Sequence, residues 1–474
     1  MLRLKSRYKY GTKKVVIAGG GISGLTAAYY LQKEIREKQL PIEVELYEAS
    51  DHLGGKIDTV KRNGFTIERG PDSFLERKKS ATRLAQEVGL EDKLVPNGTG
   101  QAYILVKNKL HKMPSGSFMG IPTRIRPFLF SGLFTPAGKL RAALDLVKPK
   151  QEIEGDQSLG LFFRRRLGNQ VVENLIEPLL SGIYAGDIDD LSLLATFPNF
   201  YHLEQEHGSL IKGLRNTMPK PSKSKQKPSM FRTFEDGLSS LVEAVEVQLD
   251  PSSVHRNKGI DHIEKKDEGY HVLLSDGTVE KADAVIAAVP YFAAQRMLSQ
   301  YGFMDNLKEM KATSVANVAM AFDAAAIKKD IDGTGFVVSR NNRFRITACT
   351  WTHKKWPHTT PEGKVMLRCY VGKPNDQEVV DLSDEEITEI ALQDLNQIMK
   401  IDAQPDFSIV TRWRNSMPQY SVGHEDRIKQ VTEKMRDELP GVYLAGASYE
   451  GIGLPDCIDQ GEAAVEKVLE HLNP

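Results

Sequence analysis

The sequence predicts an α/β fold in which a parallel sheet with covering helices is joined by an antiparallel sheet and a helical region. Near the N-terminus, an apolar strand over 15–18 runs directly into the turn Gly19-x-Gly21-x-x-Gly24, after which apolar residues recur at helical spacing. A second strand over 42–47 alternates apolar and polar residues. Much later, the continuously apolar run 284–289 is typical of a strand covered on both faces, so we expect the chain to re-enter the first sheet there.

The glycine turn points to a particular chemistry. Gly19 permits the tight turn, Gly21 lets backbone N–H groups approach a pyrophosphate, and Gly24 allows the helix to pack closely on the strand. The start of the helix offers unpaired N–H donors to phosphates, and Glu48, which ends the second strand, can accept hydrogen bonds from ribose hydroxyls. The alternative is that the glycines serve packing alone. Glu48 and a second glycine turn, Gly54-Gly55-Lys56, favour a Rossmann-like dinucleotide-binding unit instead.

Size and composition exclude several classes of protein. A chain of 474 residues exceeds what one core usually supports, so we expect two or three domains. Lys plus Arg equals Asp plus Glu at 63 each, which argues against nucleic-acid binding as the main role. The three cysteines are far apart, which fits a reducing cytoplasm and neither a metal site nor a disulfide framework. No apolar run is long enough to span a membrane, and the basic first fourteen residues lack the apolar region of a cleavable signal.

The middle of the chain predicts a second, antiparallel sheet and a helical region. Ser383 and Glu386 form a capping box at the start of a helix after the last of the strands that we expect in this sheet. The apolar stretch 118–134 is open to three interpretations: a core hairpin, a substrate gate, or a patch that touches a membrane. The expected strands are Val315–Phe322, Gly335–Ser339, Ile346–Trp351 and Val365–Val371.

Three other segments receive structural interpretations. The Pro-, Ser- and Lys-rich range 217–230 is typical of a mobile connection. The run Arg164-Arg165-Arg166 is expected to be one solvated helix face. His202 and His207 suggest a metal site, but nothing supplies the remaining ligands, so a solvated helix is the better interpretation.

A second helix start lies near the C-terminus. A strand over 441–447 is followed by Gly451-Ile452-Gly453, and Pro455 then begins a helix. Bare N–H donors at this helix start would face the same ligand as the first glycine turn, where an isoalloxazine edge gains negative charge on reduction. A site built from both ends of the chain implies a ligand long enough to span the domain. Extended FAD, as in enzymes of the glutathione-reductase type, is such a ligand.

At this point the residues resemble a known family over almost the whole chain. Gly19–Gly24, Glu48 and the Gly54-Gly55 pair are similar to the FAD-dependent amine-oxidase superfamily. The runs 69–73, 177–187 (Glu-Pro-Leu-Leu-Ser-Gly-Ile-Tyr-Ala-Gly-Asp) and 451–458, together with Trp413, closely resemble the oxygen-dependent protoporphyrinogen/coproporphyrinogen oxidases. The resemblance is nearest to the soluble, Gram-positive type that forms coproporphyrin III in heme synthesis.

The resemblance implies a Rossmann-like FAD-binding domain interleaved with an antiparallel-sheet substrate domain and a helical domain. We assign 13–72, 230–292 and 436–474 to the FAD-binding domain. Residues 73–90, 185–229 and 293–435 are assigned to the substrate-binding domain, and 91–184 to the helical domain. The implied flavin contacts are Gly19, Gly20, Gly21, Ile22, Ser23, Gly24, Glu48, Ala49, Lys56, Gly70, Pro71, Asp72, Ser73, Val254, Trp413, Gly451, Ile452 and Gly453.

The implied reaction is a six-electron oxidation of a porphyrinogen in three two-electron steps, each completed by O2 with release of H2O2. The flavin carries the chemistry, so no catalytic residue is assigned. Because the substrate carries propionates, we expect basic residues at the pocket mouth: Lys78 first, then Arg77 and Lys79, with Arg343 and Arg345 as weaker candidates. The alternative for Arg77, Lys78 and Lys79 is a solvated surface charge. The arginine by which membrane-bound relatives grip a propionate has no counterpart beside Asp72-Ser73.

Other functions stay open at this point. The same fold could serve protoporphyrinogen IX oxidation, and a non-catalytic flavin- and porphyrin-binding scaffold is an alternative of another class. An amine oxidase or a carotenoid desaturase is less compatible with the run 177–187. We expect a cytoplasmic protein, with peripheral membrane contact as an option, and the resemblance suggests transfer of the product to a ferrochelatase.

Overall fold

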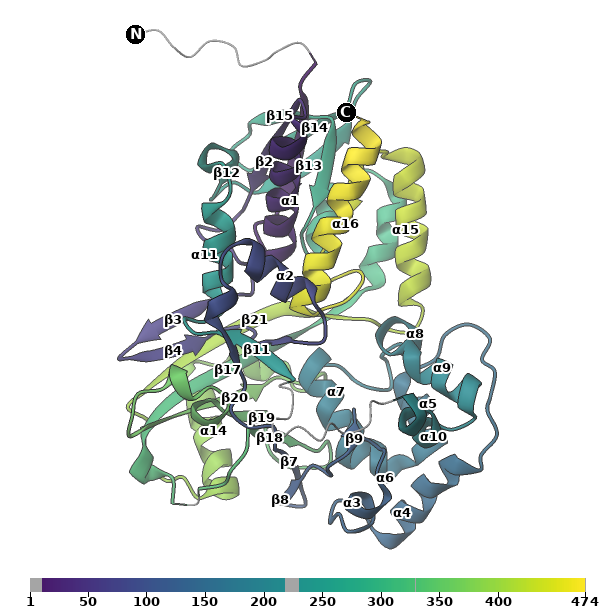
Figure 1. Cartoon of the computed structure of the whole chain (residues 1–474), viewed down its shortest axis with the longest axis vertical. Coiled ribbons are helices and arrows are strands. Elements are labelled where there is room, and N and C mark those ends of the chain that lie inside the picture. Colours follow the sequence, from purple (N-terminus) through teal and green to yellow (C-terminus); the bar gives the residue numbers. More distant parts are fainter. Residues whose placement is uncertain (1–10, 218–229, 329, 474) are drawn as a thin grey trace.

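The computed structural model describes residues 11–217, 230–328 and 330–473. Nearly all of the connection expected over 217–230, and most of the basic N-terminal segment, therefore lie outside the described residues. Figure 1 shows three regions: a sheet covered by helices near both chain ends, a second sheet at the lower left, and a cluster of helices at the lower right.

The first region is built on a five-stranded parallel sheet with the order β12-β2-β1-β16-β22. The central strand β1 pairs with β2 on one side and with β16 on the other, so Val15 lies opposite both Val44 and Ala284. Strands from three distant parts of the chain thus meet in one sheet, as the sequence predicts. Their bounds are β1 Lys13–Ala18, β2 Ile42–Tyr47, β12 Val254–His255, β16 Ala284–Ala287 and β22 Val442–Leu444.

Both faces of this sheet are covered. The helices α1 (Ile22–Lys38), α2 (Ser80–Glu87), α11 (Ser239–Val247) and α16 (Leu454–Leu472) pack on one face around Leu25, Leu31 and Val468. The other face carries α12 (Tyr291–Met297), α15 (His424–Glu438) and a three-stranded sheet. That sheet consists of β13 Ile260–Lys265, β14 Tyr270–Leu274 and β15 Val279–Ala282.

The second region is a seven-stranded sheet with the order β21-β17-β20-β19-β18-β7-β8. All four strands predicted from sequence are present, and α14 (Asp384–Met399) covers one face and begins with the predicted capping box of Ser383 and Glu386. All neighbours are antiparallel except β18 and β7. The strands are β7 Ala102–Val106, β8 Lys109–Lys112, β17 Lys311–Asp323, β18 Gly335–Val338, β19 Ile346–Trp351, β20 Lys364–Val371 and β21 Phe407–Gln419.

The helical region differs from the sequence-based division of the chain in two places. Strands β7 and β8 fall within 91–184, which was assigned to the helical domain, yet they join the seven-stranded sheet. Conversely, α8–α10 fall within 185–229, which was assigned to the substrate domain, yet residues of these helices share a core with α5 and α7. The exact domain boundaries stay a prediction. The helices are α3 Ile125–Leu129, α4 Pro136–Ala143, α5 Leu159–Leu167, α6 Asn169–Val171, α7 Glu177–Tyr184, α8 Leu193–Thr196, α9 Pro198–His207 and α10 Leu210–Thr217.

Short elements connect the three regions. The hairpin β9–β10 and the helix α3 occupy the apolar stretch 118–134, in which Phe128 and Phe134 are buried while Phe130 is exposed. This stretch is therefore partly core and partly surface. The remaining described strands and α-helices are β3 Thr59–Arg62, β4 Phe65–Glu68, β5 Phe74–Leu75, β6 Leu94–Pro96, β9 Ser117–Phe118, β10 Ile121–Pro122, β11 Phe231–Phe234 and α13 Thr352–Lys355.

The triple arginine of α5 is not one solvated face, so that expectation is wrong. Arg166 is completely buried, with its Nε 2.6 Å from Asp145 Oδ1 and its Nη1 3.2 Å from Glu204 Oε1. Arg165 also pairs with Glu204. The arginines anchor α5 to the loop before it and to α9, because a buried guanidinium needs several acceptors.

Candidate functional site

The predicted glycine turn lies where β1 ends and α1 begins. A Cβ on Gly24 would lie 1.9 Å from the carbonyl oxygen of Gly19, so only glycine permits this packing of helix on strand. Gly19 has a φ of +98°, which also favours glycine. A Cβ on Gly21 would meet no protein atom within 4 Å, although Gly21 is the N-cap of α1 and has no side-chain cap. The first turn of α1, with Ile22 and Ser23, thus begins at an open space suited to a phosphate.

Glu48 lies beside this turn. Its Oε2 accepts a hydrogen bond of 2.6 Å from the backbone N–H of Gly20, and its Oε1 accepts one of 2.8 Å from Ser50. The carboxylate is therefore fixed at the end of β2. Val254 lies on the neighbouring strand β12, opposite Leu46, and Ala49 is exposed next to Glu48. These positions suit the ribose and adenine end of a dinucleotide.

The second glycine turn packs against the first. Gly54 donates a hydrogen bond of 2.8 Å to the carbonyl oxygen of Gly20, and Gly21 and Gly54 form an isolated parallel bridge. Lys56, at the end of this turn, donates to the carbonyl oxygen of Ser416, and burial lowers its pKa. The turn leads from the glycine motif toward the seven-stranded sheet.

The loop 69–73 lies between this second turn and the seven-stranded sheet. Trp413 Nε1 donates a hydrogen bond of 2.8 Å to the carbonyl oxygen of Arg69. A Cβ on Gly70 would lie 1.8 Å from the carbonyl oxygen of Lys56, so the two segments touch directly. The structure therefore brings together Lys56, Gly70 and Trp413, three residues predicted from sequence that are far apart along the chain.

Asp72, in the same loop, has an electrostatic environment that the sequence did not reveal. Lys355 Nζ lies 2.9 Å from both carboxylate oxygens, Ser73 Oγ donates to Oδ1 at 2.7 Å, and Arg368 Nη1 lies 3.7 Å from Oδ2. Burial alone would raise the pKa of Asp72, but the charges of Lys355 and Arg368 outweigh it and hold this pKa well below its usual range. One signal could have pointed to Arg368: it is the single charged residue inside the otherwise apolar strand core 365–369.

The glycines near the C-terminus complete the arrangement. Gly453 is the N-cap of α16, and Gly451 has a φ of +121° and donates a hydrogen bond of 2.8 Å to Tyr420 Oη. Ile452, between them, packs against the helical core. Strand β22, which leads to these glycines, lies in the same parallel sheet as β1, so both helix starts lie beyond the carboxyl ends of its strands.

The basic candidates for substrate contact fall into two groups. Lys78 forms an ion pair with Asp456 in the first turn of α16, while its neighbours Arg77 and Lys79 are exposed. Arg343 and Arg345 lie elsewhere: Arg343 donates to Gln397 of α14, and the backbone N–H of Arg345 donates to Asp394 of the same helix. Since α14 covers the face opposite the loop 69–73, the structure does not bring Arg343 and Arg345 to this site.

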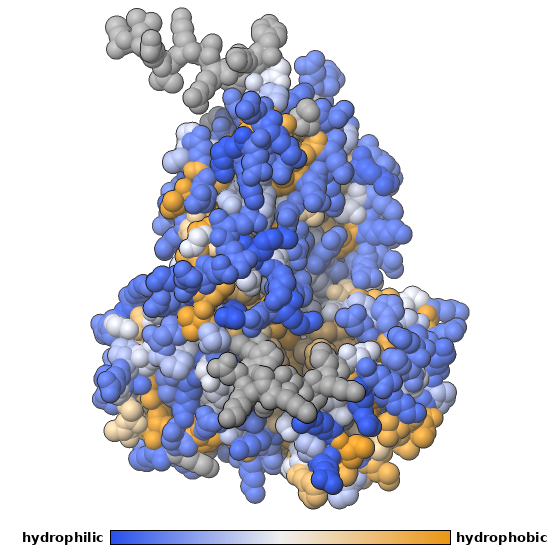
Figure 2. Space-filling view, viewed as in Figure 1, coloured by the Kyte–Doolittle hydropathy of each residue, from blue (hydrophilic) through white to orange (hydrophobic). Residues whose placement is uncertain are grey.

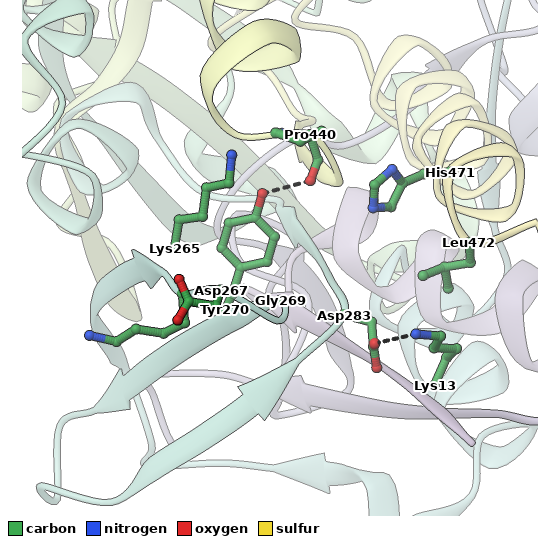
Figure 3. A pocket seen from close by; sticks show the side chains of 10 residues that line it. Lys13, Lys265, Asp267, Gly269, Tyr270, Asp283, Pro440, His471 and Leu472 are labelled. Carbon is green, nitrogen blue, oxygen red and sulfur yellow. Dashed lines mark hydrogen bonds and ion pairs between the residues drawn. The ribbon is translucent and has the colours of Figure 1, made fainter. Parts of the chain in front are cut away.

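The residues that the structure describes give little support for a metal site, for a ligand site in a second pocket or for a membrane-spanning helix. Within the described ranges, no group of three or more His, Cys, Asp or Glu residues is placed to hold a metal ion, and His202 and His207 are no exception. A pocket beside Tyr270 and His471 lies near the beginning of β1, far from the glycine turn at its end (Figure 3). Its polar groups bond one another, as Lys13 does with Asp283 and Tyr270 with Pro440. No helix in the described part of the chain could cross a membrane.

The fold and the site together define a flavin-binding oxidoreductase. The chain belongs to the family of flavin containing amine oxidoreductases, whose model matches residues 22–469. It is 54% identical to the coproporphyrinogen III oxidase of Bacillus subtilis (strain 168), over 98% of this chain and 99% of the relative. It is 46% identical to the coproporphyrinogen III oxidase of Staphylococcus aureus (strain NCTC 8325 / PS 47), over 97% of this chain and 100% of the relative.

A solved structure supports the same family and fold. A structure from Exiguobacterium sp. 255-15, described as a protoporphyrinogen oxidase, is 40% identical and superposes with a TM-score of 0.87 over 97% of this chain and 99% of that one. The resemblance found in the sequence is thereby confirmed at the level of the family and of the Rossmann-like α/β fold. The individual flavin and substrate contacts stay predictions.

Proposed function

We propose that the protein is an oxygen-dependent coproporphyrinogen III oxidase of heme biosynthesis with noncovalent FAD. It converts coproporphyrinogen III and three O2 into coproporphyrin III and three H2O2, so six electrons leave the macrocycle in pairs. The observation that carries this proposal is identity of 54% over nearly the full length of both chains with a relative of that name. The family-specific run 177–187 lies within the aligned chain, in α7 and the turn after it.

The residues of the site have distinct roles in this proposal. When bound, FAD accepts two electrons at a time from the porphyrinogen and passes them to O2. Gly19–Gly24 and Glu48 would hold the pyrophosphate and ribose, and Gly451–Gly453, at the start of α16, would offer backbone N–H donors to the flavin. The loop 69–73 and Trp413 would contact the flavin from the side of the seven-stranded sheet. Each two-electron step would remove one hydride and one proton from the porphyrinogen. The cation left by the hydride is delocalised over two pyrroles and can release its proton to solvent, so we assign no side chain as a general base.

Lys78, Arg77 and Lys79 are proposed to receive the propionates. They follow the loop 69–73 after the short strand β5, and an ion pair with Asp456 places Lys78 at the start of α16. A propionate would replace or share Asp456 as the partner of Lys78. Charge-assisted hydrogen bonds of this kind typically contribute about 1.5–3 kcal/mol where they are shielded from water.

The decisive experiment uses purified protein with an absorbance maximum near 450 nm from bound flavin. We expect porphyrin fluorescence after addition of coproporphyrinogen III under air, three H2O2 per porphyrin, and no product without O2. Faster turnover of protoporphyrinogen IX would favour the alternative oxidase, for which the description of the Exiguobacterium structure is the supporting observation. Unchanged substrate despite bound flavin would favour the non-catalytic scaffold.

The proposal extends to location and partners. We place the enzyme in the cytoplasm, and its product is the substrate type that a ferrochelatase requires. We also propose a peripheral membrane contact through one surface, here called the α3–α4 face. Figure 2 shows hydrophobic residues at the lower edge, where Figure 1 draws α3 and α4. The exposed large apolar residues of this face are Ile125, Leu129, Phe130, Leu140, Leu144 and Val147.

Charge supports a lipid surface as the occupant of this face. Residues 124–150 contain six Lys or Arg residues and a single acid, Asp145, which is fully buried. The chain as a whole has equal numbers of basic and acidic residues, so this basic excess is local. An exposed apolar surface in a segment with an excess of cations is typical of surfaces that bind anionic lipids.

A further inference from the structure

Three neighbouring strands of the seven-stranded sheet hold the loop 69–73 by its backbone. Asn317 of β17 and Trp413 of β21 both donate to the carbonyl oxygen of Arg69, at 2.5 and 2.8 Å. Arg368 of β20 donates from Nη2 to the carbonyl oxygen of Gly70 at 2.8 Å. On the other side, Gly70 touches the backbone of Lys56. The loop is therefore fixed between the sheet and the second glycine turn.

Arg368 has further guanidinium donors that the hydrogen bond to Gly70 does not use. Its side chain is 1% exposed, and its Nε and Nη1 have no hydrogen-bond partner among the described residues. Buried, unpaired donors of a charged group are costly, so their retention calls for a reason other than holding Gly70. Asp72 is the nearest carboxylate, at 3.7 Å from Nη1, which is too long for a hydrogen bond.

The charges around Asp72 do not balance. Lys355 already pairs with Asp72 through both oxygens, so Arg368 adds a second positive charge to one carboxylate. Glu68 is the other acid close to Arg368, and burial raises its pKa to about 7, which leaves it mostly protonated at pH 6. Tyr370, which contacts the guanidinium through its ring, is neutral. A net positive charge is thus buried behind the loop that contains Gly70 and Asp72.

We propose that Arg368 is a positioning residue that fixes the loop 69–73 against the flavin and, through its unbalanced charge, raises the reduction potential of that flavin. The inference rests on the proposed flavin site. Two-electron reduction adds negative charge to the ring system, and a fixed cation in a poorly solvated interior stabilises that charge. The electrons come from the substrate and leave to O2, so Arg368 itself exchanges neither electrons nor protons.

The test measures the two-electron midpoint potential of the bound flavin at pH 6 by titration against reference dyes. Arg368→Met should shift the reduction equilibrium about tenfold toward the oxidised flavin, which is roughly 30 mV for a two-electron couple. Arg368→Lys keeps the positive charge, so the midpoint potential of its flavin should stay close to that of the wild type. The matched control is Arg412→Met: Arg412 lies on β21, and donates to Val380 and Leu382 at the edge of α14, away from the loop.

If Arg368→Met does not retain flavin, the potential can be measured in a second variant, Asp72→Asn. Removal of this negative charge should raise the potential, opposite in sign to Arg368→Met. A purely structural Arg368 would lower the melting temperature or the flavin content and leave the potential of the retained flavin unchanged, which would overturn the inference. An unchanged or lower potential in Asp72→Asn would also overturn it. These titrations need no porphyrinogen. They therefore test the role of Arg368 independently of the proposed porphyrinogen oxidation.

Discussion

Lys78 and Asp456 form an ion pair that joins the segment after the loop 69–73 to the first turn of α16. The pair links the predicted substrate-binding lysine to the helix start that faces the flavin edge in our proposal. Both side chains are partly exposed, at 35% and 23%, so the ammonium can be reached by a second anion. Asp456 therefore holds Lys78 in place without blocking it.

Lys78→Met should raise KM for coproporphyrinogen III roughly five- to thirtyfold and change kcat little. The expected loss is about 1–2 kcal/mol, since a partly exposed charge contributes less than the full value of a charge-assisted hydrogen bond. Initial rates from porphyrin fluorescence measure both constants. Lys93→Met is the control, because Lys93 is an exposed lysine that pairs with Glu235. An unchanged KM in Lys78→Met would remove Lys78 from substrate recognition.

The two glycines of the first turn should respond differently to alanine. Gly21→Ala adds a Cβ into open space, so the flavin-free protein should keep its melting temperature while flavin affinity falls, since that space is where we place the pyrophosphate. Gly24→Ala forces a Cβ to within 1.9 Å of the Gly19 carbonyl oxygen and should destabilise the flavin-free protein by about 1–3 kcal/mol or more.

Thermal unfolding of the flavin-free proteins and flavin absorbance after reconstitution distinguish the two effects. Full flavin binding by Gly21→Ala would contradict the assignment of this turn to the pyrophosphate. A melting temperature of Gly24→Ala equal to that of the wild type would contradict the packing argument.

Glu68 should make stability depend on pH. Its Oε1 accepts from the backbone N–H of Leu238 and its Oε2 from Thr59, yet burial dominates and raises its pKa to about 7. The folded protein therefore binds a proton between pH 4.5 and 7 that the unfolded chain has released. Stability from this group is fully present below pH 4.5 and falls as the pH rises to 7.

Glu68→Gln should flatten the pH dependence of the unfolding free energy over this window. Urea denaturation at pH 5 and pH 7.5 measures the difference, and Glu235→Gln, at an exposed position, serves as the control. The control should show the pH dependence of the wild type. If Glu68→Gln also showed it, Glu68 would have an ordinary pKa in the folded protein.

Local patterns account for the elements that the sequence predicted correctly. The glycine turn, the apolar run 284–289 (of which 284–287 forms β16) and the capping box at Ser383 each depend on residues close together in the chain. The prediction of the seven-stranded sheet was incomplete, because it lacked strands β7, β8 and β21. Strands β7 and β8 join it from a distant segment, and no periodicity within that segment says which sheet it will join.

Buried charges could not be predicted in the same way. Arg166 sits in a run of three arginines that is typical of a solvated face, and its partners Asp145 and Glu204 are distant in sequence. Arg368 is likewise fixed by Gly70 and Asp72 from the other end of the chain. Such sites exist because the fold supplies the acceptors, so a motif search recovers the loop 69–73 but misses the cations behind it.

Phe130→Glu should abolish membrane contact if the α3–α4 face binds lipid. Phe130 is 88% exposed and packs little, so the substitution should leave stability and turnover in solution unchanged. Burial of one such side chain in a membrane interface is worth about 1.5–3 kcal/mol, and each nearby cation adds about 1 kcal/mol on an anionic surface. Co-sedimentation with phosphatidylglycerol vesicles should therefore fall at least tenfold, and wild-type binding should weaken at high salt.

The control for this experiment is Val247→Glu, which places the same charge at an equally exposed apolar residue at the end of α11. It should bind vesicles like the wild type, because α11 lies in the sheet-and-helix region away from α3 and α4 (Figure 1). Equal loss in both variants would mean that added negative charge alone repels the vesicles. Equal wild-type binding to phosphatidylcholine would exclude the basic residues as the source of affinity, and no binding to either lipid would reassign the face to a protein partner such as the proposed ferrochelatase.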